Sequence, residues 1–273
     1  MRRLIVERSG AAIPPENLAL GVSNILMTAA GEDWDATCER LVAKLVSDQE
    51  SWRLFQLDRD EVVAALRTVP AEYRSVQNFW HAFHAIYASK VGKASSVPWG
   101  DKTPANATRL RNILELFPGA KFIFMLRDVF DVAYSYGSMN VGGRQGQYIE
   151  GANRWVGANT RLMYFAKRRP QQAMFVRYEK LVSNPEASIE PVLQFLSLPS
   201  IEPVELSDAE SHDMQTSDHL RNSVGRVTGQ SSGRGRANLS QDVKDEISKI
   251  AGPLQVYFRY EPTGAVLAKS KSR

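Results

Sequence analysis

A short apolar run, from Lys121 to Arg127, constrains the fold of this chain most strongly. It follows the turn signal Pro118-Gly119, has the length of a strand and does not alternate with polar residues, which predicts a strand buried on both faces. Asp128 can cap a helix directly after it. A helix at about 148–168 and a second strand-like segment at 173–178 then repeat the pattern. Strands that alternate with helices predict an α/β fold of three layers, with a central parallel sheet flanked by helices.

Amphipathic spacing predicts several helices around this sheet. In the first third of the chain, apolar residues recur at helical spacing over residues 34–46, 59–67 and 76–90. Helix-capping residues predict further helix starts at Thr103-Pro104, Asn184-Pro185 and Ser240.

The amount of apolar material is enough for one large core. Of 273 residues, 43% are hydrophobic, and we expect a single domain over residues 1–262. We expect the helices within 33–92 to form an elaboration on the substrate side of that domain. The last stretch, 263–273, is rich in lysine and serine, and we expect it to be disordered.

Charge and cysteine content limit the partners and the compartment. The net charge of +4 suits a polyanionic ligand and would also suit nucleic acid. No nucleic-acid-binding motif is present, so we expect no nucleic-acid partner. No apolar run approaches the roughly 20 residues of a membrane span, and the N-terminus lacks the pattern of a secretory signal. The single cysteine, Cys38, excludes an internal disulfide, and we predict a cytoplasmic protein.

Two residues beyond the first predicted strand suit phosphate binding. Ligands of α/β sheets bind beyond the carboxyl ends of the strands, where Arg127 lies. Ser135 is two helical turns further on, a rise of about 10 Å, so the two side chains can hold one monoester phosphate from opposite sides. For an isolated pair, a surface arginine and an ordinary helix serine remain the commoner explanation.

Several segments, taken in order, resemble the bacterial and tyrosylprotein-type sulfotransferases. The resemblance covers roughly residues 80–260 and is more specific than any single motif. It implies a P-loop-NTPase-like sulfotransferase fold and the transfer of a sulfuryl group from 3′-phosphoadenosine-5′-phosphosulfate (PAPS) to an acceptor hydroxyl or amine, with no metal. The matching segments are Tyr87-Ala88-Ser89-Lys90, Trp99-Gly100-Asp101-Lys102-Thr103-Pro104, residues 116–123, Arg127-Asp128 with Ser135, residues 178–182, and Ser232-Gly233-Arg234 before Leu239-Ser240.

The resemblance also implies roles for single residues. Arg127 and Ser135 match the pair that holds the 3′-phosphate of PAPS, and Lys102 matches a lysine that stabilises the leaving phosphate oxygen. Tyr178 matches a tyrosine of the nucleotide pocket. Each residue alone has a plainer explanation, such as a solvated lysine, a core aromatic or a loop charge. The residues that would close over the nucleotide are Ser232, Gly233 and Arg234.

The N-terminal segment resembles the family only in part. Residues 4–10 resemble a strand and the start of the loop around the 5′-phosphosulfate, which implies that Arg8, Ser9 and Gly10 hold that side of the ligand. Glu16 matches the proposed catalytic base, with an ordinary surface carboxylate as the alternative. Only five residues separate Gly10 from Glu16, too few for a helix and a returning strand. We therefore expect a shortened loop that lacks the usual phosphate-binding helix.

A second function stays open at this stage. A relative with a shortened N-terminus can bind 3′-phosphoadenosine nucleotides, or a protein partner, without transferring anything. His81 and His84 have no third ligand at a matching spacing, so we expect no metal site. The acceptor carries a hydroxyl group, but no segment specifies its chemical class. A homodimer is compatible with the sequence.

Overall fold

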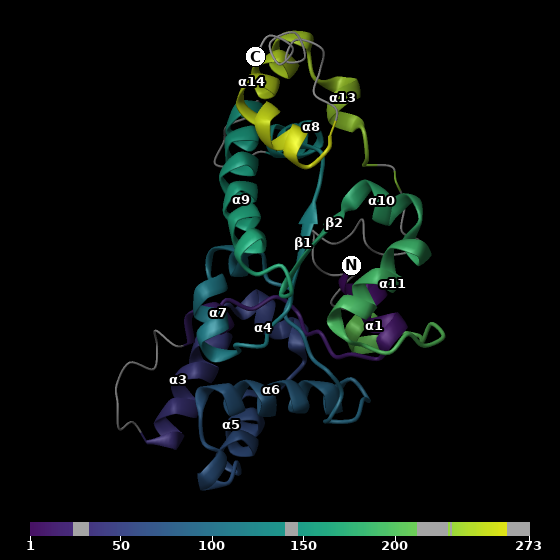
Figure 1. The fold of residues 1–273 in the computed structure, drawn as a ribbon. Helices are drawn as coiled ribbons and strands as arrows, with labels where there is room; N and C mark the ends of the chain where they lie inside the picture. Colours follow the sequence, from purple (N-terminus) through teal and green to yellow (C-terminus); the bar gives the residue numbers. More distant parts are fainter. Residues whose placement is uncertain (24–32, 140–146, 212–228, 230, 261–273) are drawn as a thin grey trace. The chain divides into compact units, whose positions relative to one another are not determined.

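The computed structural model describes residues 1–23, 33–139, 147–211, 229 and 231–260 (Figure 1). The chain divides into two compact units, and each is described by itself. The helical unit comprises residues 1–120 and 189–226, and the sheet unit comprises residues 121–188 and 227–273. A single domain over 1–262 stays a prediction. The tail at 263–273 lies outside the described residues.

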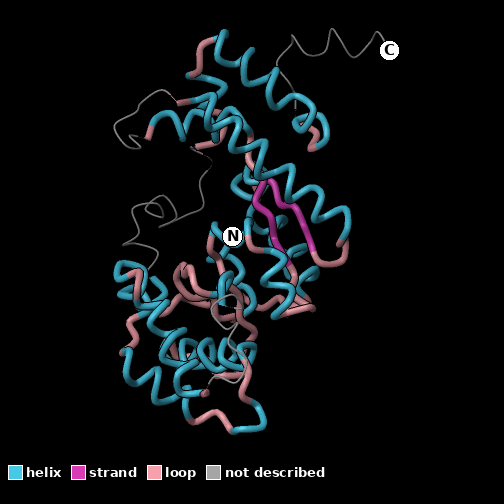
Figure 2. The backbone as a smooth tube through the Cα atoms, turned by 90° about the vertical axis from the view of Figure 1, so that its left-hand side faces the viewer, coloured by secondary structure: helices cyan, strands magenta, loops and turns pink. Residues whose placement is uncertain are grey.

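The sheet unit contains the two predicted strands. β1 (Phe122–Leu126) pairs in parallel with β2 (Ala173–Arg177), as Figure 2 shows, and the register runs from Phe122 opposite Ala173 to Leu126 opposite Arg177. Phe122 and Phe124 pack on Phe165 of α9 (Tyr148–Arg168), with ring centroids 5.2 and 5.8 Å apart. The predicted positions and the parallel direction are confirmed.

The expectation that β1 is buried on both faces is wrong. Met125 is 40% exposed, and among the described residues the sheet has only two strands. Side chains alternate across a strand, so α9 covers the face of Phe122 and Phe124 while Met125 points from the other face. The described residues are mostly helical, and the central layer is smaller than the sequence predicted.

Helices pack around the sheet into a core of their own. Val129 and Phe130 of α8 (Val129–Ser138) are fully buried against α9 and against Ile247 of α14 (Gln241–Tyr257). The helix predicted at 148–168 is confirmed as α9, and the starts predicted at Asn184-Pro185 and Ser240 are confirmed by the helices that follow them. The remaining helices of this part are α10 (Tyr178–Ser183) and α13 (Arg234–Asn238), while α11 (Pro185–Leu196) begins here and continues into the residues of the helical unit.

The short helix α13 is fastened to the start of α8. The buried carboxylate of Asp131 accepts hydrogen bonds from the backbone N–H groups of Gly233 and Gly235, both at 2.8 Å. A Cβ atom on Gly235 would lie 2.0 Å from the carbonyl oxygen of Phe130, so only glycine permits this approach. Asp128 caps α8 through the N–H of Phe130, as predicted, and pairs with Arg236 at 2.8 Å.

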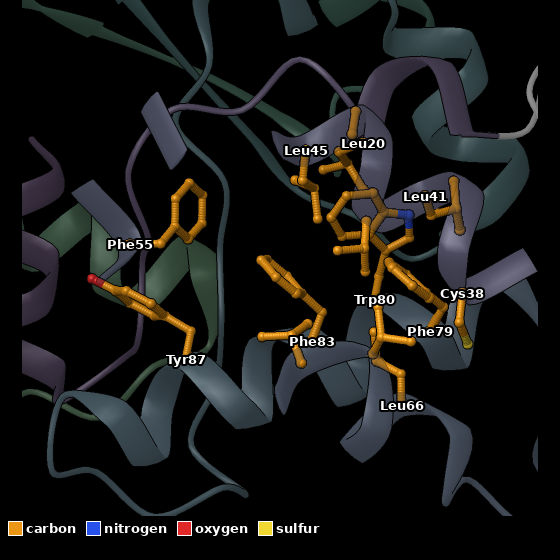
Figure 3. Packing of buried hydrophobic residues seen from close by; sticks show 14 of the residues in the cluster. Leu20, Cys38, Leu41, Leu45, Phe55, Leu66, Phe79, Trp80, Phe83 and Tyr87 are labelled. Carbon is orange, nitrogen blue, oxygen red and sulfur yellow. The ribbon is translucent and has the colours of Figure 1, made fainter. Parts of the chain in front are cut away.

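The helical unit is built around one aromatic helix. Phe79, Trp80, Phe83 and Tyr87 of α6 (Val76–Lys90) are almost fully buried and pack on the neighbouring helices (Figure 3). The three helices predicted in this part of the chain are confirmed as α3, α5 and α6, whereas the helix predicted from Pro104 is divided at Arg109. The elements are α1 (Arg2–Ser9), η1 (Leu20–Val22), α3 (Trp34–Val46), α4 (Gln49–Phe55), α5 (Arg59–Arg67), η2 (Ala71–Tyr73), α6 (Val76–Lys90), η3 (Pro104–Thr108) and α7 (Leu110–Leu116).

The prediction of a strand near residues 4–6 is wrong, because residues 2–9 form the helix α1. An ion pair between Arg3 and Glu7 at 2.7 Å links successive turns, and Gly10 ends the helix with φ 69°. A helix therefore does precede Glu16. The extended segment comes later, where Ala12 forms a parallel bridge with Trp99.

His84 is buried in the aromatic cluster beside α6. Its ring stacks on Trp99 with centroids 3.8 Å apart, and its Nδ1 lies 2.8 Å from the carbonyl oxygen of Trp80. Among the described residues its Nε2 has no hydrogen-bond partner. Burial lowers the pKa of His84 to about 3, so the folded protein holds this imidazole neutral. His81 accepts a hydrogen bond from Trp99 Nε1 at 3.0 Å, so both histidines contact Trp99 and belong to the aromatic cluster.

The described helices give no membrane span: none of them combines the necessary length and apolar character. A cytoplasmic location and a homodimer stay predictions.

Acid should destabilise the protein partly through His84. Its folded pKa of about 3 lies below the ordinary value, so the unfolded chain binds a proton first as the pH falls. Stability is therefore full above pH ~6.5, and this group costs about 2 kcal/mol at pH 5. We expect His84→Phe to reduce the change in unfolding free energy between pH 7 and pH 5, measured by urea titration. The exposed His81→Phe should reduce it less, and an unchanged difference in His84→Phe would contradict the assignment.

The close approach of α13 to α8 should make Gly235 intolerant of a side chain. We expect Gly235→Ala to lower the free energy of unfolding by about 3 kcal/mol, because the added methyl group must push α13 off the Phe130 carbonyl. Gly157→Ala in α9 is the matched control, since no atom lies within 4 Å of its added Cβ. That control should be neutral or slightly stabilising in the same denaturation experiment. Equal stabilities of the two variants would refute the packing argument.

Candidate functional site

Two predicted site residues meet at one edge of the sheet. β1 and β2 are parallel and end in register at Leu126 and Arg177, so the next residues, Arg127 and Tyr178, emerge at the same edge. The Arg127 guanidinium lies 4.7 Å from the centroid of the Tyr178 ring. The sequence predicted both residues, and the parallel register brings them together.

The segment before α13 covers this pair. Arg127 Nη2 donates a hydrogen bond to the carbonyl oxygen of Ser231 at 2.5 Å, and the Tyr178 hydroxyl shares a hydrogen bond with Ser231 Oγ at 2.7 Å. Arg127 Nε lies 3.9 Å from the buried carboxylate of Asp131. The arginine is thus held in place between an aromatic face, a carbonyl and a carboxylate.

The other residues predicted for the nucleotide lie on α8 and α13. Ser135 is exposed on α8. Its chain neighbour Tyr134 has its ring centroid 5.7 Å from the guanidinium of Arg234. Ser232 is half-buried, and Gly233 adopts a left-handed conformation with φ 81° as its N–H binds Asp131. The binding of one phosphate by both Arg127 and Ser135 stays a prediction.

Glu16 and Lys102 form an ion pair in the helical unit. Their side chains are 41% and 38% exposed, so a solute can reach both. They belong to two segments that the bridge between Ala12 and Trp99 aligns: Ala12 N–H donates to the Pro98 carbonyl, and Gly100 N–H donates to the Ala12 carbonyl. The structure thus brings together the predicted base and the predicted lysine, which are 86 residues apart.

The N-terminal end of α1 also lies near this pair. Burial, and next the charge of Lys102, lower the pKa of the Met1 α-amino group to about 6. The start of a helix carries a partial positive charge, which adds to the charge of Lys102. This end of α1 therefore suits a negatively charged group better than the far end does.

The residues predicted for the 5′ side are at the far end of α1, about 10 Å along the helix. Arg8 forms an ion pair with Glu190 at 3.0 Å and donates to the carbonyl oxygen of Ile201. Ser9 Oγ donates to the Ile5 carbonyl, and Gly10 ends the helix. These contacts are structural, and a role of Arg8, Ser9 and Gly10 in ligand binding stays a prediction.

Sequence reasoning missed the polar residues beside Glu16 and Lys102. Asn17 donates to Asp101 through its side chain and to Thr103 Oγ1 through its N–H, at 3.0 Å. Thr103 was predicted as a helix cap, but no cap hydrogen bond forms and its hydroxyl accepts from Asn17 instead. Burial raises the pKa of Asp101 to about 6. The only signal in the sequence was that Asn17 and Asp101 each adjoin a predicted site residue.

The residues around Arg127 belong to the sheet unit, and Glu16 and Lys102 belong to the helical unit. Within the described part of the chain, no group of three His, Cys, Asp or Glu side chains could hold a metal ion.

Comparison with curated proteins finds relatives that match part of the chain. Putative protein-tyrosine sulfotransferases of Caenorhabditis briggsae and Caenorhabditis elegans are 29% identical over 105 residues and 31% identical over 102 residues. Each match covers 36% of this chain, and 36% and 39% of the respective relative. The similarity to these relatives thus spans little more than a third of their length.

Two solved structures share the fold over almost the whole chain. The sulfotransferase domain from the curacin biosynthetic pathway has a TM-score of 0.56 and 18% identity, with 95% of this chain and 92% of that chain covered. The sulfotransferase domain from the Synechococcus PCC 7002 olefin synthase has a TM-score of 0.57 and 16% identity, with 95% and 89% covered. At these identities the likeness establishes a sulfotransferase fold.

The sequence profile of a family described as "Sulfotransferase family" matches residues 22–203. This range contains β1, β2, Lys102, Arg127 and Tyr178. Because the match extends over more than half of the chain, the protein belongs to the Sulfotransferase family.

Proposed function

We propose that this protein transfers a sulfuryl group from PAPS to an acceptor hydroxyl or amine. Family membership implies PAPS as the donor. The observation that carries the proposal is the position of Arg127, at the end of β1, against Tyr178 and Ser231. Ligands of parallel sheets bind at this edge, and a guanidinium donates two parallel hydrogen bonds to a phosphate.

On this proposal the sheet unit binds the nucleotide. Arg127 and Ser135 hold the 3′-phosphate, and Tyr178 lines the nucleotide pocket. The residues from Ser232 to Arg234 close over the ligand, and Asp131 supports them by fixing the N–H groups of Gly233 and Gly235. These donors fit a polyanion, because a guanidinium, a hydroxyl group and backbone N–H groups are all hydrogen-bond donors.

Glu16 and Lys102 are the groups proposed for the transfer step. The acceptor oxygen forms a bond to sulfur as the bond between sulfur and the bridging phosphate oxygen breaks. Glu16 takes the proton of the acceptor, and Lys102 stabilises the negative charge that develops on the departing oxygen. The ion pair between Glu16 and Lys102 supports this assignment, because both groups must lie close to the reacting atoms.

Nucleotide binding should depend on Arg127. By calorimetry we expect the wild type to bind 3′-phosphoadenosine-5′-phosphate, and Arg127→Ala to bind it about 10- to 100-fold more weakly, since a charged hydrogen bond is lost. Arg161→Ala removes an exposed arginine of α9 in the same unit and should bind like the wild type. Absence of heat with the wild type, or equal affinity of Arg127→Ala, would overturn the nucleotide site.

Sulfuryl transfer should depend on Glu16 and Lys102. The assay follows label from PAPS onto phenols, alcohols and amines, and it includes tyrosyl peptides because the nematode relatives carry that name. We expect Glu16→Gln and Lys102→Ala to lower kcat by about 10²- to 10³-fold. Glu72→Gln, an exposed carboxylate of the same unit, should not change kcat. Nucleotide binding without transfer to any acceptor would instead support the non-catalytic alternative.

A further inference from the structure

The segments that carry Glu16 and Lys102 are joined by a cluster of hydrogen-bonded polar residues, two of which are buried. Its members are Asn17, Asp101, Thr103 and Asn106, which we call the Asn17 cluster. Asn17 is 4% exposed and Thr103 is 7% exposed. Glu16 directly precedes Asn17, and Lys102 lies between Asp101 and Thr103, so the cluster contains the chain neighbours of both members of the ion pair.

Asn17 forms hydrogen bonds through its backbone N–H and through both ends of its side-chain amide. Its N–H donates to Thr103 Oγ1 at 3.0 Å, and its side-chain amide donates to one oxygen of Asp101. Its Oδ1 accepts from the N–H groups of Ala19 and Leu20, both at 3.1 Å, and so shapes the turn that follows. This one side chain fixes its own turn and joins it to the segment of Lys102.

Asp101 is the acceptor at the centre of the cluster. One of its oxygens accepts from Asn17 and the other from the side-chain amide of Asn106. Burial raises its pKa to about 6 despite hydrogen bonds that lower it, and the nearby charge of Glu16 raises it as well. A partly desolvated carboxylate beside another carboxylate is unfavourable in itself, and what Asp101 contributes is its two acceptor oxygens.

The chemistry proposed for Glu16 and Lys102 requires a fixed separation between them. Their side chains are long and partly exposed, and an exposed ion pair contributes little by itself to fixing two flexible side chains. The backbones of the two segments must therefore hold the geometry. Among the described residues, the bridge between Ala12 and Trp99 and the hydrogen bonds of the Asn17 cluster connect these two segments.

We propose that Asn17 and Asp101 are positioning residues, which hold Glu16 and Lys102 in the arrangement needed for transfer. Neither residue touches the reacting atoms. The proposal rests on the proposed sulfotransferase function, and it assigns to the Asn17 cluster an effect on kcat rather than on nucleotide affinity.

An exchange of the two side chains tests this directly. Asn17→Asp places a second carboxylate against Asp101, which should push the two segments apart. We expect kcat for sulfuryl transfer to fall about 100-fold, because Glu16 and Lys102 are then no longer aligned for transfer. In Asn17→Asp/Asp101→Asn, the new amide at 101 donates to the new carboxylate at 17, which still accepts from Ala19 and Leu20. We expect this double variant to recover kcat to within about fivefold of the wild type.

Affinity for 3′-phosphoadenosine-5′-phosphate separates positioning from folding. It should stay within about threefold of the wild type in all variants, since the proposed 3′-phosphate contacts are made by other residues, and kcat is expressed per nucleotide-binding molecule. Gln77→Glu makes the same change from an amide to a carboxylate at an exposed position of α6 and should leave kcat unchanged. If Asn17→Asp does not fold, Asn17→Ser keeps an oxygen for the turn but is too short to reach Asp101, and kcat should fall about 10-fold.

The outcomes distinguish failure of the positioning role from failure of the proposed sulfotransferase function. Wild-type kcat in Asn17→Asp or Asn17→Ser, or a double variant no faster than Asn17→Asp, would overturn the positioning role. A uniform loss of folded protein with normal kcat per binding molecule would overturn it too, because that is the result of a purely structural role. Failure of the proposed function itself is seen in the wild type, as absence of nucleotide binding or of transfer.

Discussion

The parallel register of β1 and β2 is the constraint on which the sheet unit depends. It ends with Leu126 opposite Arg177, so Arg127 and Tyr178 leave the sheet together and their side chains stack. An antiparallel pair would send these residues to opposite ends of the sheet. Ser231 lies at the same edge, where its carbonyl oxygen accepts a hydrogen bond from Arg127. The close contact between Gly235 and the Phe130 carbonyl holds the start of α13 against α8. The arrangement of a guanidinium, an aromatic ring and a loop thus follows from one strand pairing.

Each unit places a cation beside a carboxylate. Arg127 lies 3.9 Å from Asp131, and Lys102 pairs with Glu16. The two carboxylates have different duties: Asp131 is buried and already accepts two backbone N–H groups, whereas Glu16 is exposed enough to meet a substrate. Asp131 thus orients its arginine while it fastens a loop. On the proposed function, Glu16 is the carboxylate whose oxygen takes part in proton transfer.

The success of the sequence predictions followed how local each signal was. The strands, α8, α9 and the capping role of Asp128 depend on neighbouring residues, and the structure confirms them. The error at residues 4–6 arose because a run of Leu, Ile and Val also suits a strand, and the Arg3–Glu7 pair with the Gly10 cap outweighed that preference. The burial of Met125 was overestimated because an apolar run does not reveal how many strands flank it.

Apart from α1 and the division at Arg109, the sequence by itself predicted the positions of the strands and of the main helices, and it identified Arg127, Tyr178, Lys102 and Glu16 as candidates. Periodicity, caps and turns express torsional and solvation preferences of adjacent residues, so they can be read without the fold. Only the tertiary structure decided that Glu16 meets Lys102 and that Asn17 binds Asp101, 84 residues away. Such contacts depend on how all the intervening helices pack, so the sequence around one partner does not identify the other. A polar group needs a partner within the protein only after packing has removed water from it.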